Sequence, residues 1–329
     1  MKVRLTFIFI LLLFTVIYSC KKGNNELDGN YNCIIVCKDG QIISERYFPS
    51  GDSASTHDIR SVTKSVMSTL IGIAIDKGFI QSENENIVNY LHSLDNHIDE
   101  AKVNIKISDL LSMSSGIEGS DLTNVSEYED WHHAPNQLMY TLSKPLIHQP
   151  GEVFAYNSGA SHLLSIILTQ ATGISTFEFA KKYLFQPLSI ADHQWEQDKQ
   201  GNYNGSAGLC LTPHDMIKIG QLYLNKGMYN GKRIVSEEWI NKASTVKITT
   251  SNIEPFGPSY GYLWWIGNTH GHDYFFANGY GGQFIVVCPY LNLIVVATYN
   301  WAGIDSATAN QHWYSTLDSI INKIILAYY

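Results

Sequence analysis

The pattern of apolar and polar residues predicts strands at both ends of the chain and helices between them. Residues 31–48 alternate around Lys38-Asp39-Gly40, which is typical of a two-strand hairpin with a glycine turn. Four more strands are predicted near the C-terminus, separated by Gly, Asn or Pro, over residues 261–266, 274–277, 283–288 and 293–299. A last helix is predicted over residues 305–327, where apolar side chains recur at helical spacing.

The middle of the chain, from about residue 82 to 245, has mainly helical and loop patterns. Helices are predicted over residues 161–171 and 213–225, and an apolar helix that starts at Ser61 and ends at Gly78 precedes this region. Strands from both chain ends most economically join one antiparallel sheet. We therefore expect an α+β fold in which helices flank this sheet, the first and last helices cover a face of it, and the helical middle forms a cleft beside it.

The first 30 residues differ from the rest. Lys2 and Arg4 precede an apolar run that ends at Tyr18, and this run is shorter than the ~20 residues that a membrane-spanning helix needs. A basic start and a short apolar run predict a signal peptide over residues 1–19. The run ends in Ile17-Tyr18-Ser19-Cys20, which resembles a bacterial lipobox and implies lipidation of Cys20. An uncleaved membrane anchor is the alternative.

Residues 20–30 are polar and are expected to form a flexible tether, followed by one domain over residues 31–329. The expected location is the bacterial cell envelope, with a lipid anchor to the membrane.

The chain has 329 residues, of which 45% are hydrophobic and 16% charged, enough for one large core or two domains. Its formal net charge of -8 argues against a nucleic-acid partner, because the chain has no excess of basic side chains that could neutralise many phosphates.

The segment Ser61-Val62-Thr63-Lys64 places a hydroxyl and an amine three residues apart at the start of the first apolar helix. Positions i and i+3 share one face of a helix, so the two side chains meet. A desolvated lysine can take the proton of a serine and make it a nucleophile. Two other copies of the pattern begin at Ser19 and Ser244, but only Ser61 opens a helix that can be buried. The alternative is that Ser61 merely caps that helix.

Two later segments supply candidate partners for Ser61. Tyr156 lies in a turn-rich loop just before an apolar helix and is a candidate proton relay. A phenol has a reference pKa of ~10, so it acts as a base only if a nearby cation such as Lys64 lowers that pKa. The alternative for Tyr156 is a half-buried core aromatic. In the segment from Phe275 to Gln283, a strand enters a glycine-rich stretch where a backbone N–H can face a developing negative charge.

With these three segments in order, the chain resembles the serine β-lactamase and penicillin-binding-protein superfamily. Within it, the chain resembles the class C-like esterases and 6-aminohexanoate-dimer hydrolases, from about Tyr31 to the end. Further matching stretches lie at residues 109–116, 208–213 and 260–265. The resemblance implies a β-lactamase-like α+β fold.

The resemblance also implies roles for individual residues. Ser61 would be the acylated nucleophile, Lys64 its activating partner and Tyr156 the relay to the leaving group. The backbone N–H groups of Ser61 and of Tyr280, which follows Gly279, would form the oxyanion hole. Which of Lys64 and Tyr156 takes the serine proton stays open, because their titrations would be coupled.

Two departures from the family pattern bear on the substrate. The second motif, usually Tyr-x-Asn, is Tyr156-Asn157-Ser158, so Ser158 occupies the asparagine slot and can donate a hydrogen bond with shorter reach. The third motif, usually Lys-Thr-Gly or His-x-Gly, is Ala277-Asn278-Gly279 and lacks the cation. A missing cation in a desolvated cleft disfavours β-lactam hydrolysis. An ester or amide with a neutral or differently charged acyl group fits better.

We therefore expect a serine hydrolase that cleaves a small-molecule or peptide-like ester or amide, without a cofactor or metal. Four histidines, His132, His133, His270 and His272, lack the spacing of a metal motif. No Gly-x-Ser-x-Gly segment indicates an α/β-hydrolase. Two alternatives remain: a penicillin-binding protein, D-Ala-D-Ala peptidase or β-lactamase, and a non-catalytic homologue that binds an envelope ligand.

Overall fold

The computed structural model describes residues 31–49, 51–91, 99–122, 125–191, 194–250, 257–301 and 303–329. The predicted signal peptide, the lipidation site Cys20 and the tether lie outside these residues. In the described ranges no single helix has the length and apolar character to cross a membrane. Of the described helices, one bent pair, Ser158–Thr172 and Thr176–Phe185, has that length and apolar character together, and a bend of 77° separates its two helices.

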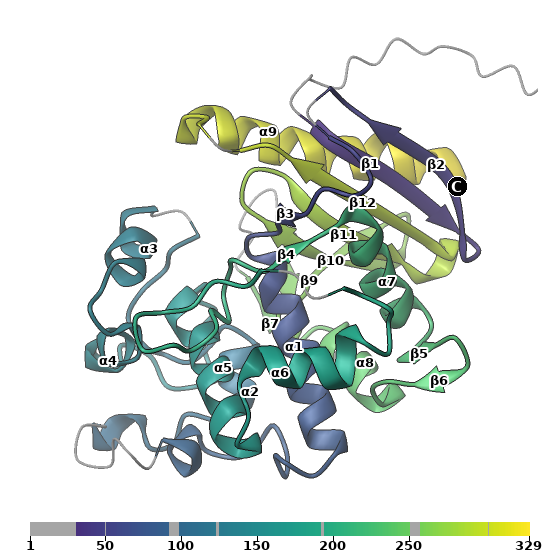
Figure 1. Cartoon of the computed structure of the whole chain (residues 1–329). Coiled ribbons are helices and arrows are strands. Elements are labelled where there is room, and N and C mark those ends of the chain that lie inside the picture. The colour runs from purple at the N-terminus through teal and green to yellow at the C-terminus, as the bar shows by residue number, and fades with distance from the viewer. Residues whose placement is uncertain are drawn as a thin grey trace, which may run out of the picture.

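Strands from both ends of the chain form one antiparallel sheet in the order β2-β1-β12-β11-β10-β9-β8-β7 (Figure 1). The N-terminal strand β1 pairs with the C-terminal strand β12, with Ile35 opposite Val296. The expected α+β fold is thereby confirmed. The strands are β1 Tyr31–Lys38, β2 Gln41–Tyr47, β7 Ile248–Thr249, β8 Ser259–Tyr260, β9 Trp265–Thr269, β10 His272–Gly279, β11 Gln283–Cys288 and β12 Leu293–Tyr299.

The predicted turn and most strand positions agree with the structure. Asp39 and Gly40 both have positive φ, 52° and 78°, as the tight turn of a two-residue hairpin requires. The strand expected over residues 261–266 begins later, at Trp265. The reason is a turn in which the Gly261 N–H donates to the Trp264 carbonyl at 2.8 Å and Leu263 has a φ of 59°.

The middle of the chain is mainly helical, as predicted, and lies beside the sheet (Figure 1). The helices are α1 Val62–Asp76, α2 Ile107–Leu111, α3 Val125–His132, α4 Gln137–Ser143, α5 Ser158–Thr172, α6 Thr176–Ala180, α7 Pro213–Leu224, α8 Glu237–Ala243 and α9 Ser306–Ser319. Short strands β3 His57–Asp58 and β4 Cys210–Leu211 pair with each other, as do β5 Met228–Tyr229 and β6 Lys232–Arg233. The last helix continues beyond α9 as a π-helical turn, Ile320–Ile324, and a 3-10 turn, Ile325–Tyr328.

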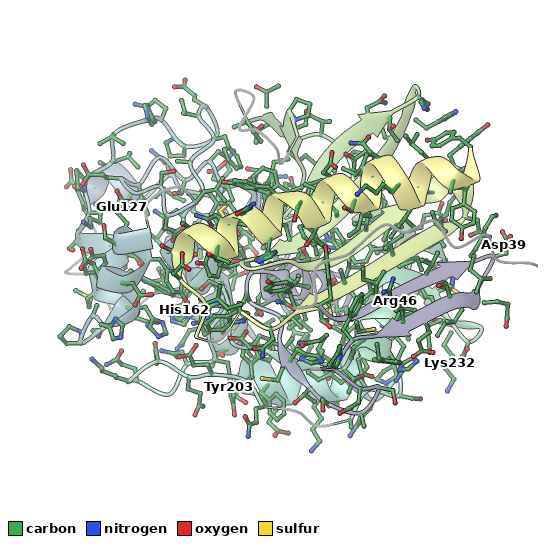
Figure 2. The ribbon with its side chains drawn as sticks, turned by 90° about the horizontal axis from the view of Figure 1, so that it is seen from above. Asp39, Arg46, Glu127, His162, Tyr203 and Lys232 are labelled. Carbon is green, nitrogen blue, oxygen red and sulfur yellow. The ribbon has the colours of Figure 1, made fainter. Side chains whose placement is uncertain are left out.

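Helices cover both faces of the sheet. Helix α7 packs closely on one face, since a Cβ on Gly220 would lie 2.7 Å from Ile294 of β12. Helix α9 crosses the opposite face (Figure 2), where Trp313 donates a hydrogen bond to the Asn278 side chain of β10. Tyr223 of α7 contacts Phe275 of the same strand, and successive side chains of a strand point to opposite faces.

The first and last helices therefore do not share a face of the sheet. Helix α1 packs beside α7, and the hydroxyls of Thr69 and Tyr223 are hydrogen-bonded at 3.0 Å. This placement corrects the expectation that α1 and α9 cover the same face. Every residue of α1 from Val62 to Ala74 is buried, and the helix ends as predicted, with Gly78 at a φ of 74°. A helix that is apolar nearly all round is typical of a protein core.

Candidate active site

Ser61 lies at the N-terminus of α1, in the wall of a cavity of about 370 Å³ between the sheet and the helical middle. Its hydroxyl makes no N-cap hydrogen bond to the helix, although Ser61 occupies the N-cap position. Instead the hydroxyl accepts a hydrogen bond from Lys64 at 3.0 Å. The geometry thus favours the nucleophile interpretation of Ser61 over the capping alternative.

Lys64 is the buried amine of this site, with 1% of its surface exposed. Its Nζ atom donates to Ser61 Oγ, Ser158 Oγ and the Ser206 carbonyl, each at 3.0 Å. Burial lowers the pKa of Lys64 from 10.5 to about 7, against the opposing effect of the Asp121 carboxylate. A neutral amine keeps two N–H donors and gains a lone pair, which can accept the Ser61 proton.

Tyr156 lines the same cavity as Ser61 and is 6% exposed. Its ring stacks on Trp265 with 6.0 Å between centroids, and Lys64 Nζ lies 4.8 Å from its ring centroid. Burial raises the pKa of Tyr156 above 10, and a hydrogen bond with Ser61 only partly opposes this. The direction is opposite to the lowering that a neighbouring Lys64 cation would cause. At neutral pH the phenol therefore keeps its proton and can donate it.

The glycine-rich segment packs against the start of α1. A Cβ on Gly279 would lie 2.4 Å from the Ile59 carbonyl, so only glycine allows this contact. The contact brings Tyr280 into the wall of the cavity that Ser61 lines. Within the described part of the chain, neither the Ser61 nor the Tyr280 N–H has a hydrogen-bond acceptor. Both N–H groups are therefore available to bind a negatively charged oxygen.

Ser158 and Asn157 take different positions at the start of α5. Ser158, in the slot of the missing motif asparagine, accepts the hydrogen bond from Lys64 and lines the Ser61 cavity. Asn157 is the N-cap of α5 and accepts a hydrogen bond from the Ala160 N–H at 2.9 Å. Its side chain lines a neighbouring cavity of about 290 Å³ with Gly119. Asn157 is therefore placed to hold Ser158 rather than to meet a molecule at Ser61.

Asp121 belongs to the site but was not identified from the sequence. Its carboxylate accepts a hydrogen bond from the Ser158 N–H at 2.8 Å, and its own N–H donates to the Tyr156 carbonyl at 2.9 Å. Burial raises the pKa of Asp121, while the nearby Lys64 and the Ser158 N–H lower it. A single sequence carries no signal for this aspartate, because no motif spacing links it to residues 156–158.

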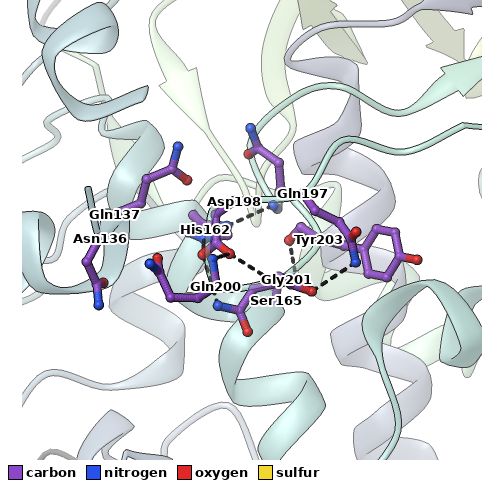
Figure 3. Close-up of polar contacts among 12 residues, drawn as sticks. Asn136, Gln137, His162, Ser165, Gln197, Asp198, Gln200, Gly201 and Tyr203 are labelled. Atoms are coloured by element: carbon purple, nitrogen blue, oxygen red, sulfur yellow. Dashed lines mark hydrogen bonds and ion pairs between the residues drawn. The ribbon is translucent and has the colours of Figure 1, made fainter. Parts of the chain in front are cut away.

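The loop that carries the Ser206 carbonyl is tied to α5 by His162, which with Asp198 forms the polar network of Figure 3. The side-chain oxygen of Asn204 accepts from the Ser206 N–H at 2.9 Å. The same loop is anchored by His162 of α5, whose Nε2 lies 3.1 Å from the Asp198 carboxylate and whose Nδ1 accepts from the Gly205 N–H at 3.2 Å. Because Nδ1 is an acceptor, the proton of the neutral imidazole lies on Nε2. Burial raises the pKa of Asp198, but bonds from His162 and Asn202 outweigh it and lower the pKa to about 2.

The copy of the motif at Ser244 does not form a comparable site, and the copy at Ser19 lies outside the described residues. Ser244 is the C-cap of α8 and donates to the Ile240 carbonyl at 2.8 Å, while Lys247 lies beyond the helix, over the ring of Tyr262. Among the residues that the structure describes, no group of three or more His, Cys, Asp and Glu side chains is arranged to hold a metal ion.

Comparisons with known proteins find similarity over most of the chain. A family model described as Beta-lactamase matches residues 33–314. The chain is 22% identical over 309 residues to a 6-aminohexanoate-dimer hydrolase of Paenarthrobacter ureafaciens, covering 88% of this chain and 76% of that protein.

Solved structures share the fold. A proposed 6-aminohexanoate-dimer hydrolase from Bacillus anthracis has a TM-score of 0.71 at 22% identity, covering 90% of this chain and 81% of that one. A penicillin-binding protein from Bacillus halodurans has a TM-score of 0.69 at 18% identity, covering 89% and 96%. These likenesses show that the overall fold is shared.

Proposed function

The chain belongs to the β-lactamase family, and from this premise we propose that it is a serine hydrolase that cleaves an ester or amide through an acyl-enzyme on Ser61. The observation that carries the proposal is the hydrogen bond between Ser61 Oγ and Lys64 Nζ at 3.0 Å, beside a cavity. Because the pKa of Lys64 is about 7, much of the lysine is the free amine near neutral pH. A base whose pKa lies near the working pH is well suited to proton transfer.

Acylation begins when Lys64 Nζ takes the Ser61 proton and Ser61 Oγ attacks the substrate carbonyl carbon. The carbonyl π electrons move to oxygen, which becomes an oxyanion. The free N–H groups of Ser61 and Tyr280 support this charge, and the N-terminus of α1 adds a positive dipole. Losing one such donor typically costs about 10²–10³ in rate.

The leaving group then needs a proton. Tyr156 keeps its proton at neutral pH and lines the same cavity as Ser61, which supports its role as the donor. The oxyanion collapses, the bond to the leaving alkoxide or amine breaks, and the leaving atom receives the proton by way of Tyr156. The proton gained by Lys64 restores that of Tyr156. The free Lys64 amine then takes a proton from water, whose oxygen attacks the acyl carbon. The bond between that carbon and Ser61 Oγ breaks, the acid leaves, and Lys64 returns the proton to Ser61 Oγ.

The third motif supports an esterase or amidase over a β-lactamase. Ala277 is completely buried, and the Asn278 side chain accepts a hydrogen bond from Trp313 on the opposite face of the sheet. Neither side chain supplies a cation at that strand. We therefore propose that simple esters or short amides are better substrates than nitrocefin or D-Ala-D-Ala peptides.

A screen with p-nitrophenyl esters, short amide oligomers, nitrocefin and D-Ala-D-Ala peptides tests this proposal. Ser61→Ala should abolish turnover, and Lys64→Ala should lower it by about 10²–10⁴-fold. The second copy of the motif offers matched controls, since Ser244→Ala and Lys247→Ala should keep wild-type rates. Equal turnover in wild type and Ser61→Ala would overturn the proposal. Ligand binding without any turnover would instead favour the non-catalytic alternative.

A further inference from the structure

The wall of the Ser61 cavity contains a positively charged side chain that no sequence motif identified. Arg60 directly precedes Ser61 and lines the same cavity. Its guanidinium carbon lies 4.6 Å from the ring centroid of Trp301 and 5.6 Å from that of Tyr128, two other residues of the cavity wall. Contacts with two rings fix the plane of a guanidinium and leave its edges free for hydrogen bonds.

The backbone of Arg60 is held in an unusual conformation. Its φ is 48°, a left-handed value that is unfavourable for a residue with a Cβ. Asp58 stabilises this arrangement twice: its carboxylate accepts from the Arg60 N–H at 2.8 Å and from Nη1 at 3.3 Å. A strained residue next to a nucleophile suggests that its side chain has a function there.

Most of the hydrogen-bonding capacity of Arg60 is unused. A guanidinium has five N–H donors, and in the described part of the chain the only hydrogen bond from this one goes to Asp58. The side chain is 19% exposed and lines both the Ser61 cavity and a second cavity that Asp58 also lines, so it is only partly covered by protein. A guanidinium fork matches the two oxygens of a carboxylate, and such charge-assisted bonds are among the stronger ones in proteins.

The other charged groups of the cavity are already engaged. Asp121 accepts from the Ser158 N–H, and Lys64, which lies next to the cavity but does not line it, is bonded to three protein oxygens. Glu129 lines the cavity too and lies 3.3 Å from His133. Among the described charged residues lining this cavity, Arg60 is therefore the cation with donors left for a ligand.

Arg60 also lies next to the motif that lost its cation. A Cβ on Gly279 would be 3.3 Å from the Arg60 Cβ, so the arginine side chain starts beside the end of β10. We propose that Arg60 binds a carboxylate of the substrate from the start of α1 rather than from β10, so that the preferred esters or amides carry a negative charge near the scissile bond, in a different position from the carboxylate that the cation of the third motif would hold. The inference rests on the proposed hydrolysis at Ser61 and names the class of substrate. The carboxylate can belong to the acyl group or to the leaving group.

Three esters of similar size separate these cases. A p-nitrophenyl hexanoate is neutral, a p-nitrophenyl adipate monoester carries the carboxylate on its acyl chain, and a hexanoate ester of a carboxy-nitrophenol carries it on the leaving group. Arg60→Gln should lower kcat/KM for at least one charged ester by roughly 10- to 100-fold, mainly through KM, because it removes charge-assisted hydrogen bonds. The neutral ester should change by less than about 3-fold, and Arg60→Lys should retain part of the preference.

Arg46→Gln is the matched control, because it removes the same charge from β2. Figure 2 shows Arg46 well away from Glu127 of α3, the helix whose residues Tyr128 and Glu129 line the Ser61 cavity. It should not change the preference for charged esters. An equal loss on all three esters, or no loss on any, would overturn the proposal. If no ester is hydrolysed, adipate binding to Ser61→Ala still tests it: calorimetry should show binding that Ser61→Ala/Arg60→Gln loses, and equal binding by both would refute the role of Arg60.

Discussion

At the scale of single residues, the proposed proton transfer from Ser61 to Lys64 depends on the burial of Lys64. An exposed lysine is protonated at neutral pH and cannot act as a base. Lys64 is enclosed by α1, α5 and the Ser206 loop, and burial lowers its pKa to about 7. Its neighbour Tyr156 is affected in the opposite sense, since burial of an acid favours the neutral phenol. In the proposed mechanism, the same desolvation therefore favours Lys64 as the base and Tyr156 as the proton donor.

The activity should therefore depend on pH through Lys64. The base form of a lysine exists above its pKa, so kcat/KM for a neutral ester should rise with pH through about 7 and then level off. A pH profile of kcat/KM measures this acid limb. A profile that is flat between pH 5 and 9 would exclude Lys64 as the base.

Replacing Asp121 should shift the acid limb of the pH profile of kcat/KM. The Asp121 carboxylate raises the pKa of Lys64, so Asp121→Asn removes an anion and should shift the limb to lower pH. Asparagine keeps an oxygen that can accept from the Ser158 N–H, so the fold should survive. An unchanged limb, or a shift to higher pH, would show that Asp121 does not act on Lys64.

Single residues could be predicted from the sequence only where a short spacing links them. Ser61 and Lys64 lie three positions apart on one helix, so their contact follows from helical geometry alone. Asp121 and Arg60 could not be identified in this way. The role of Asp121 depends on a contact with Ser158 that only the tertiary fold creates, and that of Arg60 on the rings of Tyr128 and Trp301.

At the scale of secondary structure, the contact between β10 and the start of α1 determines the geometry of the site. The two elements touch where Gly279 meets the Ile59 carbonyl. Strands β11 and β12 were predicted with their observed bounds, because turn residues separate two strongly apolar runs. The start of β9 was not, because a turn closed by Gly261 and Trp264 looks like strand sequence.

Gly279→Ala should therefore impair activity at a distance from the reacting atoms. The added Cβ would lie 2.4 Å from the Ile59 carbonyl, so β10 and α1 have to move apart and the N–H groups of Ser61 and Tyr280 separate. We expect kcat to fall by about 10²–10³, as for loss of an oxyanion donor. Denaturant unfolding should show a loss of stability of about 1–3 kcal/mol. Wild-type kcat in this variant would contradict the assigned oxyanion hole.

At the scale of the whole molecule, the two ends of the chain complete one sheet. Strand β1 pairs with β12, so the sheet is complete only when the first strand of the domain meets the last. The general architecture could be predicted because strand patterns occur at both ends and helical patterns between them. The faces covered by α1 and α9 could not, because the apolar pattern of a helix does not specify which side of a doubly covered sheet it contacts.

The attachment of this domain to a membrane remains a proposal from the sequence. The predicted tether, residues 20–30, joins the lipidation site Cys20 to the first strand, β1, which begins at Tyr31. Cys20→Ala should move the protein from the membrane fraction to the soluble fraction, because it removes the thiol that carries the lipid. Metabolic labelling with a fatty acid should mark the wild type and not this variant. Labelling of both, or of neither, would contradict the proposed anchor.

The central claim is that Ser61 becomes acylated, and intact-protein mass spectrometry after treatment with a fluorophosphonate probe tests it most directly. The wild type should gain the mass of one probe, and peptide mapping should locate the adduct on Ser61. Ser61→Ala should gain none, while Ser244→Ala should be labelled like the wild type. An adduct on another residue, or equal labelling of wild type and Ser61→Ala, would contradict the account.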